Sequence, residues 1–160
     1  DNARLVSNLH ANLGGLYRMN GHPDLAREHM EKSISLLDQF NLLHINDSIP
    51  QIANYAMFLT EQQEPERGIS ELQKLSGIIK EYHSDDCLDY AKVQETLGTI
   101  YLMTANLPQA KTHFKRAFKI YEKIWADEPE MIEAKYQEIQ ELYPQIGFSI
   151  GKTLSGLLTK

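Results

Sequence analysis

The side chains that could bind a metal or carry out acid–base chemistry in this chain are mainly its six histidines. They are His10, His22, His29, His44, His83 and His113. None has a partner at His-x-x-x-His or Glu-x-x-His spacing, which would place two ligands on one face of a helix, and no second cysteine is present. The sequence therefore predicts no metal site. His10 is expected to be a packed histidine, with a functional role as the alternative.

The other candidates for catalysis also lack partners. Cys87 follows His83 by four residues, but the Ser84–Asp86 stretch between them predicts a turn, so the pair should not share a helix face. Gly151-Lys152-Thr153 lacks the upstream glycine and the strand of a phosphate-binding loop. We expect no catalytic residues, no cofactor and no enzymatic activity. An enzymatic alternative would depend on the histidines alone.

Composition narrows the class of protein and of partner. The chain has 160 residues, with 42% hydrophobic and 24% charged residues, which fits a soluble folded protein. Its net charge of −6 argues against non-specific nucleic-acid binding, which needs a positive surface. No apolar run reaches the ~20 residues of a membrane span. With a single cysteine, no internal disulfide can form, and we expect a cytoplasmic location.

Small residues recur along the chain at one fixed interval. Gly14, Ala56 and Gly98 are separated by 56 − 14 = 98 − 56 = 42 positions. The same interval relates Ala26, Gly68 and Ala110, and also Met30, Leu72 and Phe114. A period between 20 and 50 residues is typical of repeat arrays. Small residues at matching places indicate two helices that approach each other closely.

Turn and proline positions divide each repeat into two helices. Gly21, Gln63 and Ala105 mark the turns, and Pro23, Pro65 and Pro108 follow them as expected for the start of a second helix. The predicted helices cover about 3–20, 23–40, 47–62, 65–82, 87–104, 108–125 and 130–143. Asp47 or Ser48 is expected to cap the third of them. No stretch predicts a strand.

These repeats resemble the tetratricopeptide repeat family. Its pattern appears as His10, Leu13, Gly14, Tyr17, Ala26, Met30 and Ser33, as Ile52, Tyr55, Ala56, Leu59, Gly68, Leu72 and Leu75, and as Leu97, Gly98, Tyr101, Ala110, Phe114 and Ala117. The family's usual repeat has about 34 residues; this longer one is similar to kinesin light-chain repeats. The resemblance implies an all-α fold, a right-handed α-α superhelix of antiparallel helix pairs.

The resemblance also implies one tetratricopeptide-like domain over 1–160. Its repeats would cover about 7–48, 49–90 and 91–132, with a degenerate fourth repeat over 133–160. Pro144 should end the last predicted helix early. Residues 145–160 are expected to form a capping helix over the open end of the array. An unstructured or partner-bound tail is the alternative.

In the family, the first helices of the repeats line a concave groove. Carried onto this chain, the groove positions include Asn8, Ala11, Gly15, Arg18, Met19, Pro50, Ala53, Met57, Thr60, Glu61, Lys92, Glu95, Thr99, Leu102, Met103, Ala134, Gln137, Glu141, Pro144 and Gln145. Three methionines among them could adapt to apolar partners. The alternative is that they pack against neighbouring helices.

Some family members clamp the C-terminal carboxylate of chaperones, and the clamp positions can be compared residue by residue. They hold Ala11, Gly15, Asn54, Lys92 and Thr96 in this chain. Only Asn54 and Lys92 match, and two of the three cations are missing, so chaperone-tail binding is rejected. The candidate partner-binding residues are Arg18, Met19, Asn54, Met57, Lys92, Glu95, Thr99 and Met103.

The sequence favours an interaction module that binds a protein or peptide in this groove. One alternative is a peptide-sensing regulatory domain of a larger bacterial regulator. Another is a structural role, in which apolar surface at an end of the array leads to self-association. Neither nucleic acid nor membrane is expected as a partner.

Overall fold

The computed structural model describes residues 2–144, and within them it contains seven α-helices and no strand. The helices are α1 (Asn2–Met19), α2 (Pro23–Gln39), α3 (Ser48–Glu61), α4 (Pro65–Tyr82), α5 (Leu88–Met103), α6 (Leu107–Ile124) and α7 (Pro129–Leu142). The predicted all-α helical repeat fold is confirmed. No helix in 2–144 is both long enough and apolar enough to cross a membrane.

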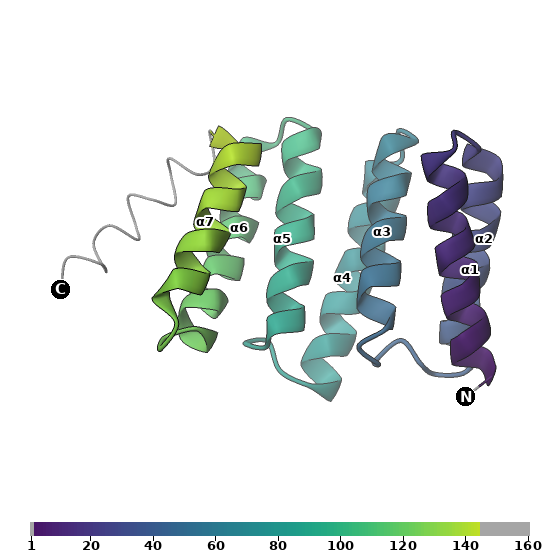
Figure 1. The fold of residues 1–160 in the computed structure, drawn as a ribbon, viewed down its shortest axis with the longest axis horizontal. Coiled ribbons are helices and arrows are strands. Elements are labelled where there is room, and N and C mark those ends of the chain that lie inside the picture. Colours follow the sequence, from purple (N-terminus) through teal and green to yellow (C-terminus); the bar gives the residue numbers. More distant parts are fainter. Residues whose placement is uncertain (1, 145–160) are drawn as a thin grey trace. The chain divides into compact units, whose positions relative to one another are not determined.

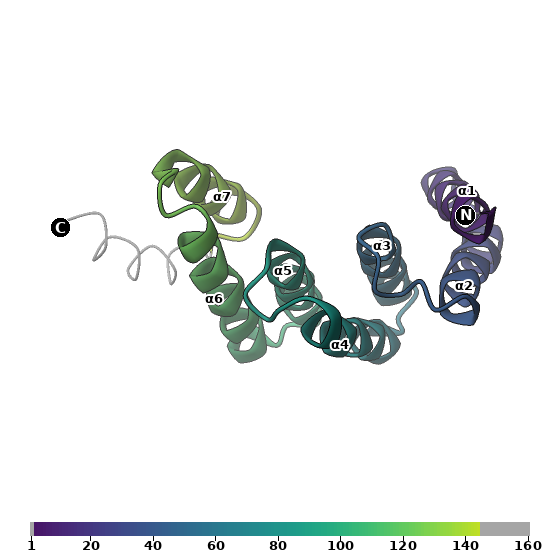
Figure 2. The same ribbon diagram turned by 90° about the horizontal axis from the view of Figure 1, so that it is seen from below.

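The chain divides into two compact units, Asp1–Asp85 and Asp86–Lys160. Unit 1 contains two helix pairs, α1–α2 and α3–α4, and unit 2 contains the pair α5–α6 followed by α7 (Figure 1). In unit 1, α1 and α3 lie on one side and α2 and α4 on the other (Figure 2). The single domain expected over 1–160 stays a prediction.

The turns within the three helix pairs have the same backbone structure. Gly21, Gln63 and Ala105 have φ angles of 73°, 66° and 59°. The residue after each donates a hydrogen bond to the carbonyl five positions earlier, as from His22 to Tyr17 at 2.9 Å. This is the Schellman arrangement that satisfies the last carbonyls of a helix. The turn structure therefore recurs every 42 residues, as the helices do.

The prolines mark the helix starts to within one residue, but the predicted cap of α3 is not formed. Pro23, Pro65 and Pro129 are first residues of their helices, whereas α6 begins one residue before Pro108. The predicted cap at Asp47 or Ser48 is wrong. Asp47 makes no capping bond: its backbone is already helical, with φ −66° and ψ −25°, and its Oδ2 accepts from Arg4 Nε at 2.6 Å and from Asn8 Nδ2 at 3.2 Å.

Ser48 does not cap α3, and α5 is capped by a cysteine. The Ser48 hydroxyl donates to the carbonyls of Leu43 and Ile45, so it holds the preceding link instead of capping α3. The Ser84–Asp86 stretch, predicted as a turn, precedes α5 without capping it. The capping position belongs to Cys87, whose sulfur accepts a hydrogen bond from the Tyr90 backbone N–H.

Close helix contacts occur at the small residues of the repeat. A Cβ atom added to Gly68 would lie 2.6 Å from the backbone oxygen of Ala56, which places α4 directly against α3. At Gly14 the added atom would lie 2.6 Å from Met30 Cγ, and at Gly98 it would lie 2.9 Å from the Phe114 ring. All three distances are too short for real Cβ contacts, so only glycine fits without a shift.

Each unit has its own buried apolar centre. In unit 1, Phe58 and Leu59 of α3 pack with Ala26 and Met30 of α2 and with Tyr55. The Arg27 guanidinium lies 5.6 Å from the centre of the Phe58 ring. These contacts connect the first helix pair to the second.

In unit 2, fully buried side chains come from all three helices: Leu97 and Ile100 from α5, Phe114 and Tyr121 from α6 and Ile139 from α7. Helix α7 ends at Leu142, two residues before Pro144, in agreement with the expected early end. The capping helix expected over 145–160 lies outside the described residues.

Candidate functional site: a groove between α1 and α3

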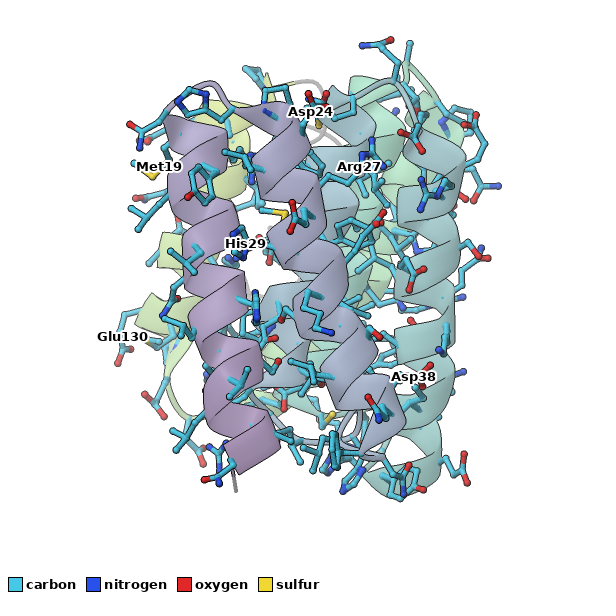
Figure 3. The ribbon with its side chains drawn as sticks, turned by 90° about the vertical axis from the view of Figure 1, so that its right-hand side faces the viewer. Met19, Asp24, Arg27, His29, Asp38 and Glu130 are labelled. Atoms are coloured by element: carbon cyan, nitrogen blue, oxygen red, sulfur yellow. The ribbon has the colours of Figure 1, made fainter. Side chains whose placement is uncertain are left out.

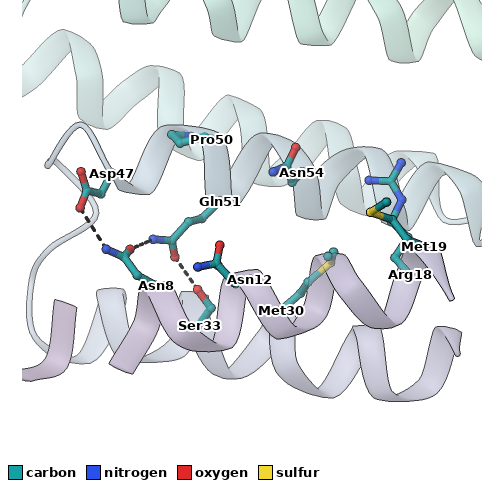
Figure 4. A pocket seen from close by; sticks show the side chains of 12 residues that line it. Asn8, Asn12, Arg18, Met19, Met30, Ser33, Asp47, Pro50, Gln51 and Asn54 are labelled. Atoms are coloured by element: carbon teal, nitrogen blue, oxygen red, sulfur yellow. Dashed lines mark hydrogen bonds between the residues drawn. The ribbon is translucent and has the colours of Figure 1, made fainter. Parts of the chain in front are cut away.

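Unit 1 contains a groove of about 510 Å³ between α1 and α3 (Figure 4). Its walls consist mainly of amide, apolar and small side chains. They are Asn8, Ala11, Asn12, Gly15, Arg18 and Met19 of α1, Met30 and Ser33 of α2, and Asp47, Pro50, Gln51 and Asn54 from the start and middle of α3. A groove of this size fits a short peptide segment or a small molecule.

A buried polar network holds one end of the groove. The Ser7 hydroxyl bonds to Gln51 Oε1 at 2.9 Å and to the Ser33 carbonyl at 3.1 Å, and Ser33 also donates to Gln51. The Gln51 amide then donates to Asn8 Oδ1 at 2.5 Å, as Figure 4 shows. Because every member has a partner, this network fixes the spacing of α1, α2 and α3.

Asn12 and Asn54 are different, because their carboxamides have no hydrogen-bond partner among the described residues. Both side chains are exposed and line the groove (Figure 4). They also occupy the same position of successive repeats, since 54 − 12 = 42. Each carboxamide can donate two hydrogen bonds and accept two. The groove therefore presents unused donors and acceptors from both of its walls.

An ion pair joins α1 and α3 beside the groove. Arg18 Nε donates to Glu61 Oε2 at 2.8 Å, and a second guanidinium nitrogen contacts the other carboxylate oxygen. Such a two-bond pair holds its geometry better than a single contact. It neutralises both charges, so the groove offers amides rather than a net charge to a ligand.

Of the four partner-binding residues predicted in unit 1, three line the groove and one does not. Arg18, Met19 and Asn54 line the groove, and Met19 is 84% exposed. Met57 is half-buried and does not line it. Asn12 was missed by the sequence analysis, although the 42-residue interval from Asn54 leads directly to it. Its position was not among those carried over from the family for the first repeat.

The predicted unit 2 residues lie on α5, and three of the four, Lys92, Glu95 and Thr99, already bond to other residues of unit 2. Glu95 accepts from the Tyr121 hydroxyl at 2.6 Å and pairs with Lys135 at 2.9 Å. Burial acts to lower the Lys135 pKa, but the carboxylates of Glu95 and Glu138 outweigh it and raise the pKa above its ordinary value. Binding roles for these residues stay predictions.

The remaining three residues of that group are at the surface of α5 or bonded within it. Lys92 is exposed and lies 3.8 Å from Asp89. The Thr99 hydroxyl donates to the carbonyl of the preceding turn at 3.1 Å. Met103 is half exposed. Only Lys92 and Met103 therefore present side chains that a partner could contact freely.

Three histidines, His10, His29 and His113, pack between the two helices of a repeat. His10 and His29 approach with their Nδ1 atoms 2.8 Å apart, and His29 stacks on Tyr17. In the third repeat His113 stacks on Tyr101 with the same 14° interplanar angle and bonds to Gln94 at 2.9 Å. No group of three metal-ligating side chains is present in residues 2–144.

Burial lowers the pKa of both His10 and His113. For His10 the neighbouring His29 and Lys32 charges lower the pKa further, while Glu28 opposes them; for His113 Arg116 adds to the effect of burial. The folded state therefore favours the neutral rings. Because the unfolded chain takes up these protons at a higher pH, stability must fall as the solution becomes acidic.

We expect the free energy of unfolding to decrease between about pH 7 and about pH 5, the range just around and below the ordinary histidine pKa. In His113→Gln the decrease should be smaller, because one of the two depressed groups is gone. Urea unfolding at both pH values measures this. His22→Gln, which changes an exposed histidine in a turn, is the control. A full decrease retained in His113→Gln would show that burial of this ring does not control its protonation.

Comparison with known proteins agrees with the repeat geometry. Residues 48–123 match the family model described as tetratricopeptide repeat. These residues belong to the tetratricopeptide repeat family. A structural comparison matches the crystal structure of BtubC (BKLC) from P. vanneervenii, with a TM-score of 0.74 and 16% identity. The match covers 98% of this chain and 66% of that chain. No curated protein sequence matches significantly.

Family and fold give the general class of function. Tetratricopeptide repeats generally mediate protein–protein interactions, and the fold is typically a non-enzymatic scaffold. At 16% identity the likeness to BtubC shows a common fold and nothing finer.

Proposed function

We propose that this protein is a peptide-binding interaction module and that the α1–α3 groove holds an extended segment of its partner. The observation that carries the proposal is the pair of unpartnered carboxamides, Asn12 and Asn54, at equivalent positions on the two groove walls. An extended peptide has unpaired backbone N–H and C=O groups along its length. A carboxamide can bond to one of each.

The surroundings of the two asparagines support a peptide rather than a charged small molecule. Arg18 and Glu61 neutralise each other, so no free cation marks an anion site. Gly15 and Ala11 keep the α1 wall low, which leaves space for a main chain. Met19 and Met30 provide adaptable apolar contacts for the peptide's side chains. Backbone bonding would then give affinity, and these contacts would give selectivity.

The test selects peptides from a random library displayed on phage, using the whole chain as target, and measures their affinity by calorimetry. Asn12→Ala combined with Asn54→Ala should weaken binding by about 30- to 1,000-fold, since four hydrogen bonds of about 0.5–1 kcal/mol each are lost. Asn46→Ala, which changes an exposed asparagine outside the groove, should leave the affinity unchanged.

Two results would overturn the proposal. One is a selection that yields no peptide with saturable binding. The other is a peptide whose affinity is the same for the double variant and the unchanged chain. Thermal unfolding of both variants, followed by circular dichroism, confirms that the exposed substitutions leave the fold intact.

A further inference from the structure

The outer edge of unit 1, formed by α1 and α2, has a face of exposed apolar side chains. On α1, Leu5, Leu9 and Leu16 are 66%, 58% and 55% exposed, and Phe40, just after α2, is 54% exposed. A hollow of about 580 Å³ between the two helices adds Val6 and Leu36. Figure 3 views this edge with α1 and α2 in front. We call Leu5, Val6, Leu9, Leu16, Leu36 and Phe40 the α1–α2 edge.

The repeat shows that this edge occupies interface positions. Adding 42 to Leu9 and Leu16 gives Gln51 and Phe58 of α3. Both are buried against the first helix pair: Gln51 accepts from Ser7, and Phe58 packs in the cluster with Met30. The same positions in the first repeat are apolar but have no helix pair over them among the described elements. Large exposed apolar patches of this kind mark interaction surfaces.

We propose that the α1–α2 edge binds the same edge of a second copy of this chain, related by a two-fold axis. Leu5, Leu9 and Leu16 are all exposed and lie four and seven residues apart along α1, so they fall on one side of the helix. That spacing is the seam by which two helices pack side by side. A leucine seam is complementary to itself, so a two-fold axis needs no second, different surface.

The size of the edge fits a weak to moderate dimer. The exposed fractions of its leucines, valine and phenylalanine correspond to roughly 500 Å² of apolar surface on each copy. With a rim of neighbouring side chains the two copies together would bury about 1,200 Å², the lower end of stable interfaces. Dissociation constants in the micromolar range are expected for such an area.

An alternative to pairing of edge with edge is that the edge binds the surface that covers α3 in this chain. That surface belongs to α1 and α2. That surface is already used, since Arg27 lies over Phe58 and Glu31 accepts from the Tyr55 hydroxyl at 2.8 Å. A second copy therefore cannot offer its own α2 surface to the edge without opening unit 1.

The test is the mass of the whole chain in solution, measured by light scattering and sedimentation from about 1 to about 100 μM. We expect a concentration-dependent rise from 18.4 kDa to twice that mass. Leu9→Glu combined with Leu16→Glu should weaken association at least about a hundredfold, because the two-fold axis places each charge in the interface twice. The fold should remain, since both side chains are mostly exposed.

Leu142→Glu is the matched control, because Leu142 of α7 is 61% exposed and lies in unit 2. It should dimerise like the unchanged chain. A monomer at all concentrations, or growth beyond two copies, would overturn the proposal. So would a dimer that Leu9→Glu and Leu16→Glu leave intact. Circular dichroism of each variant separates lost association from lost folding.

Discussion

Replacing Gly68 with alanine is expected to lower the free energy of unfolding by about 2 kcal/mol, even though alanine is the better helix former. The new Cβ would lie 2.6 Å from the Ala56 carbonyl oxygen and 3.2 Å from its carbon. Both are backbone atoms, so no side chain can rotate away and α3 and α4 must move apart. Urea unfolding followed by circular dichroism measures the change.

The same substitution at Gly77 is the control. Gly77 lies in the same helix and is exposed, and a Cβ there would have no neighbour within 4 Å. Gly77→Ala should therefore raise the free energy of unfolding by about 0.5–1 kcal/mol, because alanine loses less backbone entropy on folding. Stabilisation by both substitutions would contradict the close approach of α3 and α4.

Phe58→Ala should have the largest effect on stability, lowering the free energy of unfolding by about 3–5 kcal/mol. The ring is 1% exposed and connects α3 to α2 through Ala26 and Met30. Its loss leaves a cavity at the junction of the two helix pairs and removes the surface under Arg27. The same urea titration measures this effect.

Phe40→Ala changes a phenylalanine that is 54% exposed, so it should cost less than about 1 kcal/mol at a concentration where the chain is monomeric. Equal losses at Phe40 and Phe58 would mean that the first and second helix pairs are not joined through the Phe58 cluster. Equal slopes of the unfolding curves would confirm that the two variants unfold by comparable transitions.

Much of the fold could be predicted because the 42-residue interval repeats local signals. Gly21, Gln63 and Ala105 identify the three turns, and all three have positive φ angles. The prolines give helix starts within one residue. These features depend on neighbouring residues and on a pattern that recurs, so three copies reinforce one another.

The absence of a capping bond at Asp47 could not be predicted, since its side chain makes a contact across a long stretch of sequence. Asp47 is a good capping residue by type, but Arg4, 43 positions earlier, takes its carboxylate. Nothing near Asp47 in the sequence signals this partner. The pairing of His10 with His29 likewise becomes visible only when α1 and α2 are placed side by side.

The family pattern predicts the groove residues on α1 better than those on α3. It gives Arg18 and Met19 on α1, yet it gives Met57, which does not line the groove, and omits Asn12. The side-chain directions that decide this depend on how α1 and α3 are rotated about their axes. The buried Ser7–Ser33–Gln51 network sets those rotations, and its hydrogen bonds are not apparent in the sequence.

The most direct test of peptide binding between α1 and α3 is to follow side-chain amide resonances by NMR while a selected peptide is added. The account predicts saturable shifts of the Asn12 and Asn54 side-chain NH₂ signals, with the Asn46 signal unchanged. Saturable binding that leaves Asn12 and Asn54 unaffected and shifts resonances elsewhere would contradict it.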